Sequence, residues 1–254
     1  MYVPKHFREE DLAVLQTLMR QYSFATLVST QEDGLPIATH LPVLLEAEPA
    51  PYGTLKAHLA LGNPQWRALQ EEREVLVIFQ GPHAYISPSW YEVELSVPTW
   101  NYATVHAYGR PRLISEVGEL YTHLSALVST YEGNFPQPSY SALANASSRS
   151  LCQSGKEEPS YSALANASSR SLCQSGKEEP WPFEKLPLDY VEKMMKGVVG
   201  LSIEITRLEG KYKMSQNRST QDQQQVVEHL NRSADTTIRG VAAIMRERLS
   251  RQVE

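Results

Sequence analysis

Two apolar runs of strand length stand on either side of an Asp-Gly turn near the start of the chain. The first run is FATLVST (24–30) and the second is LPIATHLPVLLE (35–46). Two such runs joined by Asp-Gly are a strong signal for a β-hairpin. Proline cannot donate a ladder hydrogen bond, so Pro36 and Pro42 place the second strand at an edge or at a bulge. The hairpin favours an antiparallel β architecture.

The remaining apolar patterns predict further strands and helices at short intervals. Further strands are expected at 53–61, 75–81, 101–114 and 198–215. Helices are expected at 9–22, 66–74, 116–132 and 188–196, and two more within 220–249, broken near Asn231. The segment 82–100 is rich in Pro and aromatic residues, and we interpret it as a loop. Short strands at regular spacing predict a closed or partly open β-barrel decorated by helices, which is a mainly β, α+β fold.

The composition is that of a globular protein. The chain has 254 residues, of which 41% are hydrophobic, enough to bury a core of ordinary density. No apolar stretch approaches the roughly 18 to 20 residues of a transmembrane helix, and the first residues lack the layout of a secretory signal. We therefore expect a cytoplasmic protein. The net charge of −5 argues mildly against nucleic-acid binding, which depends on Lys and Arg.

Residues 138–158 and 159–179 are two identical copies of one segment, PSYSALANASSRSLCQSGKEE. Solenoid repeats keep a core pattern while their surface positions vary, so full identity indicates a recent duplication, an engineered insertion or an assembly error. Each copy has few large apolar residues, and we expect a mobile loop outside the core. Cys152 and Cys173 lie in the two copies without His or Cys neighbours at ligand spacing, so we predict neither a metal site nor a required disulfide.

Several predicted strands carry polar and aromatic residues where plain strand residues would suffice. A single histidine in a strand is more often a satisfied core or interface residue than a ligand. Together, however, these residues indicate a convergent binding site. They are Thr39 and His40 in ATHLP, Lys56 and His58 in KAHLA, and Trp100, Asn101 and Tyr102 in TWNY.

A second polar group, LEGKYKMSQNRS, follows the last long strand. Lys213 and Arg218 have the charge to meet a phosphate, while Ser215, Gln216 and Asn217 offer hydrogen bonds to a polar ligand. The alternative is a polar helix cap followed by a solvated turn. No phosphate loop, GxGxxG fingerprint, Ser-His-Asp order or metal-ligating cluster stands out, so a phosphate-bearing ligand would be held by another device.

Six motifs together resemble the PaiB-type family of FMN-binding negative transcriptional regulators. The resemblance covers nearly the whole chain outside 138–179, and its longest motifs are highly specific. The motifs are MYVPKHF (1–7), DGLPIATHLP (33–42), GNPQW (62–66), VLVIFQGPHAYISPSWY (75–91), VPTWNYATVHAYG (97–109) and KYKMSQNR (211–218).

The resemblance implies a fold, a cofactor and an assembly. The fold is a six-stranded, Greek-key-like split β-barrel with peripheral helices, related to pyridoxamine-phosphate oxidase-like flavoproteins. The assembly is a homodimer that shares two FMN sites. The implied domains are a barrel at 1–137 and 180–218, the insertion at 138–179 and a helical tail at 219–254. In the wider superfamily the strand resembling 38–45 runs beside the flavin ring, and the strand resembling 53–60 contributes phosphate contacts.

The resemblance assigns the contacts with the flavin ring to Thr39, His40 and Leu41. It brings Lys56, Ala57 and His58 near the phosphate. The motifs around Trp100, Asn101 and Tyr102, and around Lys213, Ser215, Gln216, Asn217 and Arg218, match the family too, and we assign their FMN contacts by chemistry.

Three functions share these motifs, and fold similarity does not separate them. The first is an FMN-binding regulator resembling proteins that restrain protease synthesis and sporulation. The second is a flavin-dependent oxidoreductase of unknown substrate, and the third is a protein that stores or senses FMN. Residues 207–254 carry nine Lys and Arg against six Asp and Glu, which permits a DNA contact but fits a solvated helix face better.

Overall fold

The computed structural model describes residues 1–48, 51–92, 95–134, 181, 183 and 186–251. The duplicated segment 138–179, predicted to be a mobile loop, lies outside these described residues. Contacts divide the chain into one unit of residues 1–123 and 189–254 and a second unit of residues 124–188. The first unit contains the sheet and every predicted site residue.

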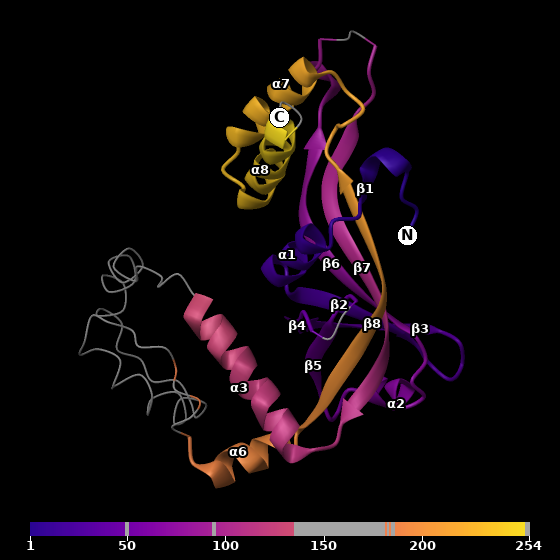
Figure 1. The fold of residues 1–254 in the computed structure, drawn as a ribbon, viewed down its shortest axis with the longest axis vertical. Coiled ribbons are helices and arrows are strands. Elements are labelled where there is room, and N and C mark those ends of the chain that lie inside the picture. Colours follow the sequence, from indigo (N-terminus) through magenta and orange to yellow (C-terminus); the bar gives the residue numbers. More distant parts are fainter. Residues whose placement is uncertain (49–50, 93–94, 135–180, 182, 184–185, 252–254) are drawn as a thin grey trace, which may run out of the picture. The chain divides into compact units, whose positions relative to one another are not determined.

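One antiparallel sheet organises the first unit (Figure 1). Its strands follow the order β3-β2-β6-β7-β8-β5-β4, and β1 pairs with β8 at the side of this path. Six strands are seven residues or longer, as the predicted barrel requires, and β1 and β4 add two short ones. The strands are β1 (Arg8–Glu9), β2 (Phe24–Thr30), β3 (Pro36–Pro42), β4 (Leu44–Glu46), β5 (Thr54–Ala60), β6 (Val75–Ile86), β7 (Thr99–Ile114) and β8 (Val198–Lys213).

The predicted hairpin is present as β2 and β3, which pair from Phe24↔Pro42 to Thr30↔Pro36. Gly34 in the connecting turn has a φ of +83°, a left-handed conformation that glycine adopts without steric cost. The strand order ends at β3, so both prolines lie on an edge strand. The edge placement predicted from Pro36 and Pro42 is therefore confirmed.

β6 is longer than the sequence indicated. The segment after Gly81 was interpreted as loop, but the strand continues through Pro82 to Ile86 and pairs with β7 on both sides of Gly81 and Pro82. The register shifts between Gln80 and His83, and this irregularity accommodates a proline that cannot donate to the ladder. The interpretation of residues 82–86 as loop was wrong for this reason.

Helices connect and follow the strands of the sheet. α1 (Leu12–Gln21) begins at Asp11, whose side chain accepts hydrogen bonds from the backbone N–H groups of Ala13 and Val14. The predicted helical tail is a pair of helices, α7 and α8, as expected from the break near Asn231. The other helices are α2 (Gln65–Leu69), α3 (Val117–Asn134), α6 (Leu188–Met195), α7 (Thr220–Asn231) and α8 (Thr236–Arg251), with single turns η1 (Lys5–Phe7) and η2 (Pro88–Trp90).

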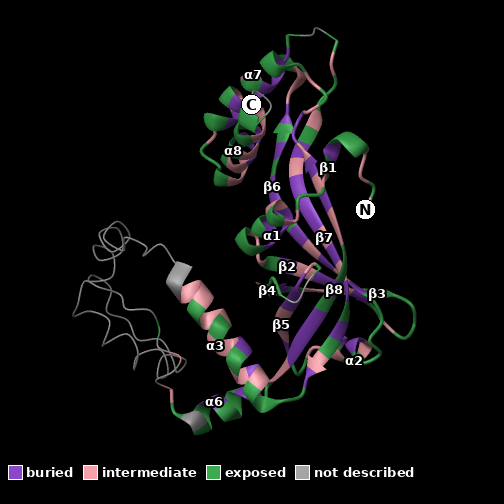
Figure 2. Ribbon diagram, viewed as in Figure 1, coloured by how far each residue is buried: buried purple, intermediate pink, exposed green. Residues whose placement is uncertain are grey.

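The core lies between one face of the sheet and the helices α1 and α8 (Figure 2). Phe79 of β6 and Val105 of β7 are fully buried, and Leu18 of α1 and Met245 of α8 are nearly so. Removing this apolar surface from water stabilises the fold by roughly 25 cal/mol per Å². The C-terminal helices are therefore part of the core of the first unit.

Candidate functional site

Strands β6, β7 and β8 turn alternate residues to opposite faces, because successive side chains in a strand point to opposite sides. Residues directly opposite in an antiparallel pair share a face. His83, Tyr102 and Lys213 are such partners across the three strands, as are Tyr85 and Trp100 across two. These side chains lie on the face away from the core, which we call the open face. Trp100 is 53% exposed and Tyr85 47%.

A pocket of about 320 Å³ lies on the open face. The Trp100 ring lies 6.1 Å from the rings of both His83 and Tyr85. At the pocket floor, Thr104 donates a hydrogen bond to the backbone carbonyl of Phe79 at 3.0 Å. The pocket therefore combines aromatic surface with polar groups. It is lined by Gln80, His83, Trp100, Tyr102, Ala103 and Thr104.

Two lysines of β8 stand beside this pocket. Lys213 donates hydrogen bonds to the Thr99 hydroxyl and to the carbonyl oxygen of Trp100, the latter at 3.0 Å. Lys211 Nζ lies 5.2 Å from the Tyr102 ring centre and donates to the carbonyl of Tyr2. Within the described part of the chain, neither lysine forms an ion pair with a carboxylate. Burial, and then the charge of Lys211, lower the pKa of Lys213. An anion placed here would relieve that repulsion.

Asn101 points away from the open face and is fully buried. Its Nδ2 donates to Ser215 Oγ at 2.9 Å and approaches the Met245 sulfur at 3.4 Å. Ser215 has a φ of +61°, which is unusual for a residue with a side chain. This buried pair ties the start of β7 to the turn after β8.

The rest of the predicted 213–218 group forms that turn. Gln216 accepts a hydrogen bond from the Met214 N–H and donates to the Tyr212 carbonyl. Asn217 is exposed. The Arg218 guanidinium lies 4.4 Å from the centre of the Tyr91 ring and donates to Ser96. Ser219 caps α7 by accepting from the Asp222 N–H, so the helix-cap reading of this segment also holds.

Lys56 and His58 of β5 lie at the other end of β8, under the first turns of α3. Lys56 forms a salt bridge with Glu119 at 2.8 Å, and Arg112 reaches the same carboxylate at 2.9 Å. Hydrogen bonds from Lys56 and then from Arg112 lower the pKa of Glu119. The charge of Lys56 is therefore partly neutralised. Ala57 belongs to the core.

The half-buried His58 of β5 pairs with the buried His123 of α3. His58 Nδ1 lies 3.3 Å from His123 Nε2, and the buried second nitrogen of His123 has no hydrogen-bond partner among the described residues. Burial, followed by the charges of His58 and Lys56, lowers the pKa of His123 to about 4. Burial also lowers the pKa of His58. Both rings are therefore neutral at neutral pH.

The three predicted residues of β3 have different surroundings. Thr39 donates to the Gln65 side chain and accepts from Asn63 Nδ2 at 2.9 Å. His40 is exposed on the open side of β3, with its Nδ1 2.9 Å from the Thr26 hydroxyl. Leu41 is 4% exposed and packs in the core.

The predicted site residues thus form separate groups in a single chain. Lys56 pairs with Ser202 of β8, whereas Tyr102 pairs with Lys213 at the far end of the same strand. At ~3.3 Å per residue, Ser202 and Lys213 are separated by roughly 36 Å of strand. That length exceeds an FMN molecule.

Several residues of the open-face pocket and of the group around Lys56 and His58 were not predicted from the sequence. Gln80, His83 and Thr104 line the pocket, and Lys211 flanks it. His83 and Tyr85 alternate with the buried Ala84 and Ile86, which is a strand pattern. It was overlooked because residues 82–100 were interpreted as a loop. Glu119 and His123 were also missed, although their four-residue spacing places them on one side of a helix.

The sequence profile of the family described as "Putative FMN-binding domain" matches residues 1–207. The chain belongs to this family. Protease synthase and sporulation protein PAI 2 of Bacillus subtilis (strain 168) is 33% identical over 253 residues, covering all of both chains. The uncharacterized protein AN0679 of Emericella nidulans is 29% identical over 277 residues, covering 98% of this chain and 97% of that protein. The resemblance stated from the motifs is confirmed.

Solved structures show the same fold at low identity. Flavocytochrome Anf3 from Azotobacter vinelandii superposes with a TM-score of 0.53 at 13% identity, covering 87% of this chain and 77% of that one. The conserved hypothetical protein Rv2991 from Mycobacterium tuberculosis gives 0.50 at 11% identity, covering 86% and 94%. The predicted α+β fold of a flavin-binding split barrel is confirmed for this member of the FMN-binding family. No helix in the described ranges is long and apolar enough to cross a membrane.

Proposed function

We propose that this member of the FMN-binding family binds FMN at the pocket on the open face and works as an FMN-dependent regulator. One observation carries the proposal. Lys211 and Lys213, which make no ion pair among the described residues, stand beside an aromatic pocket. A planar ring joined to a phosphate needs this combination of surfaces.

The side chains at the pocket match the three parts of FMN, which are the ring, the ribityl chain and the phosphate. Trp100 and Tyr102 offer aromatic surface to the ring. Gln80 offers donors and acceptors to the ring edge or the ribityl hydroxyls. Lys211 and Lys213 offer charge-assisted hydrogen bonds to the phosphate. Bound FMN supplies a ring that accepts and returns one or two electrons.

We further propose a homodimer in which a second copy completes each site. The β5 residues implied by the family resemblance lie too far along the sheet to join this pocket within one chain. A second copy would bring its own Lys56 to the open face. The apolar residues Leu95 and Val97 belong to the segment of chain that joins β6 to β7, and their side chains are 91% and 71% exposed. Such exposed apolar residues suit burial against another chain.

A titration of the purified full-length protein with FMN, read by flavin fluorescence and by mass from light scattering, tests both proposals. We expect about one FMN per subunit in a dimer, and release of flavin as dilution produces monomers. A monomer that retains FMN tightly would refute the shared site. Absence of FMN binding would refute the cofactor proposal.

The regulatory role draws on the relative whose name refers to protease synthesis and sporulation. DNA as the partner has weaker support, because Arg248 and Arg251 of the C-terminal helix are engaged by Glu9 and Glu247. Salt-sensitive binding of the holoprotein to a promoter fragment would support a DNA-binding regulator. Bleaching of bound flavin by NAD(P)H, without DNA binding, would instead favour the oxidoreductase.

A further inference from the structure

The strands that carry the FMN pocket on one face carry helix α8 on the other. A contact from each of the three strands illustrates this. On β6, a Cβ at Gly240 of α8 would lie 3.0 Å from Pro82, the residue before His83 of the pocket. On β7, the Met245 sulfur lies 3.4 Å from Asn101 Nδ2.

The third contact is on β8. The Arg248 guanidinium lies 4.7 Å from the centre of the Tyr212 ring. Tyr212 is buried toward the helix, while the neighbours Lys211 and Lys213 stand at the pocket. Each contact to α8 is therefore made by a residue adjacent in sequence to a group at the pocket.

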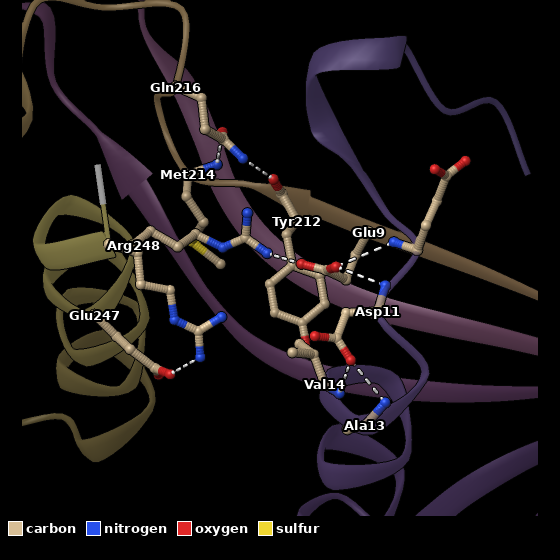
Figure 3. A network of polar contacts seen from close by, with 11 residues as sticks. Glu9, Asp11, Ala13, Val14, Tyr212, Met214, Gln216, Glu247 and Arg248 are labelled. Atoms are coloured by element: carbon tan, nitrogen blue, oxygen red, sulfur yellow. Dashed lines mark hydrogen bonds and ion pairs between the residues drawn. The ribbon is translucent and has the colours of Figure 1, made fainter. Parts of the chain in front are cut away.

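An ion pair fixes the C-terminal half of α8 at this position. Arg248 of α8 donates to the Glu9 carboxylate of β1, as Figure 3 shows together with Tyr212 beneath the guanidinium. The two side chains are only 25% and 14% exposed, so the pair is shielded from solvent more than a surface pair. This ion pair and the three contacts hold α8 directly behind the pocket.

We propose that α8 responds to occupancy of the FMN pocket and that its docking on the back of the sheet regulates FMN affinity. The inference rests on the proposed FMN site. A strand is a stiff unit with side chains on both faces, so ordering Trp100, Tyr102 and Lys213 by a ligand also orders Asn101 and Tyr212 behind them.

The hydrogen bond between Asn101 and Ser215 couples β7 to the turn after β8. Both groups are buried, and a shift that broke their hydrogen bond would leave polar atoms unpaired. The strand end and the turn after β8 therefore move together, with Met245 of α8 in contact with the same amide. Coupling between sites is reciprocal, so a change that loosens α8 must weaken FMN binding by the factor with which FMN tightens α8.

Amide hydrogen exchange of the full chain, with and without saturating FMN, tests the inference directly. We expect exchange in residues 236–251 to slow several-fold when FMN binds, although α8 faces away from the pocket. Helix α6 (Leu188–Met195), which precedes the Val198 end of β8, at the opposite end of that strand from Lys213, serves as the internal reference and should be unchanged. FMN binding with unchanged exchange in α8 would overturn the inference while leaving the FMN site intact.

A pair of arginine variants tests the reciprocal effect. Arg248→Ala removes the contacts to Glu9 and Tyr212 without touching the pocket, and we expect FMN affinity to fall roughly 5-fold or more. Arg246→Ala, an exposed position on the same helix, is the matched control and should retain parental affinity. Equal affinity of both variants would overturn the coupling. If Arg248→Ala does not fold, the exchange measurement on the parent chain decides alone. Failure of the parent chain to bind FMN would instead refute the FMN site itself.

Discussion

Lys213 reaches across the β7–β8 ladder to the backbone carbonyl oxygen of Trp100, with an Nζ to O distance of 3.0 Å. The ladder itself pairs Lys213 with Tyr102. The ammonium group is therefore held by backbone and hydroxyl acceptors and by no described carboxylate. This geometry makes Lys213 the first residue with which to test the phosphate end of FMN.

Lys213→Ala should weaken FMN binding by about 1 to 3 kcal/mol, because a charge-assisted contact to the phosphate is lost. Riboflavin, which lacks the phosphate, should lose much less affinity. Flavin fluorescence titrations of both ligands measure the two effects. Lys196→Ala removes the same charge from an exposed position near the start of β8 and is the control. Equal losses for FMN and riboflavin would assign Lys213 a role in packing.

Trp100→Ala should weaken FMN and riboflavin alike, because the indole offers aromatic surface to the ring that both ligands share. The expected loss is roughly 0.5 to 1.5 kcal/mol from the ring contact alone. Trp100→Phe should restore part of it, and titrations of both variants with both flavins give the comparison. Unchanged affinity in Trp100→Ala would place the ring elsewhere.

The buried side chain of His123 should make the protein less stable as the pH falls. The pKa of His123 is lowered from 6.5 to about 4. In the unfolded chain His123 therefore binds a proton below pH 6.5, whereas in the folded chain it binds one only near pH 4. The free energy of unfolding therefore decreases as the pH falls through this window.

Urea denaturation at several pH values between 7 and 4 measures this dependence. His123→Leu should show a shallower decline in stability than the parent chain. His6→Leu, at an exposed position, should retain the parental slope. A His123→Leu variant with the full parental slope would show that other groups cause the acid sensitivity.

Ser215→Gly should be more stable than Ser215→Ala. Both variants lose the hydroxyl that accepts from Asn101, so that loss cancels in the comparison. The backbone at this position has a φ of +61°, which costs alanine roughly 1 kcal/mol and costs glycine little. Chemical denaturation gives the difference, and an alanine variant as stable as the glycine variant would show that the turn relaxes to another conformation.

Local sequence signals predicted most of the elements of this fold. The Asp-Gly pair and the flanking apolar runs located β2 and β3, and the prolines placed β3 at an edge. The spacing of Leu15 and Leu18 predicted α1, whose buried side they form. These features succeed because turn geometry and side-chain periodicity are properties of neighbouring residues. The motifs likewise sufficed to establish the family.

The arrangement of the candidate site was decided by tertiary packing. Alternation along a strand separates Trp100 and Tyr102 from Asn101, but only the packing of α8 determines that Asn101 lies on the buried side. From the sequence, Lys56 and Lys213 are likewise equally good candidates for contacting a phosphate. Glu119, brought over β5 by the start of α3, partly neutralises Lys56, whereas Lys213 has no described carboxylate partner and can meet an anion. Contacts between residues so far apart in the chain depend on how the elements pack, and no local pattern encodes them.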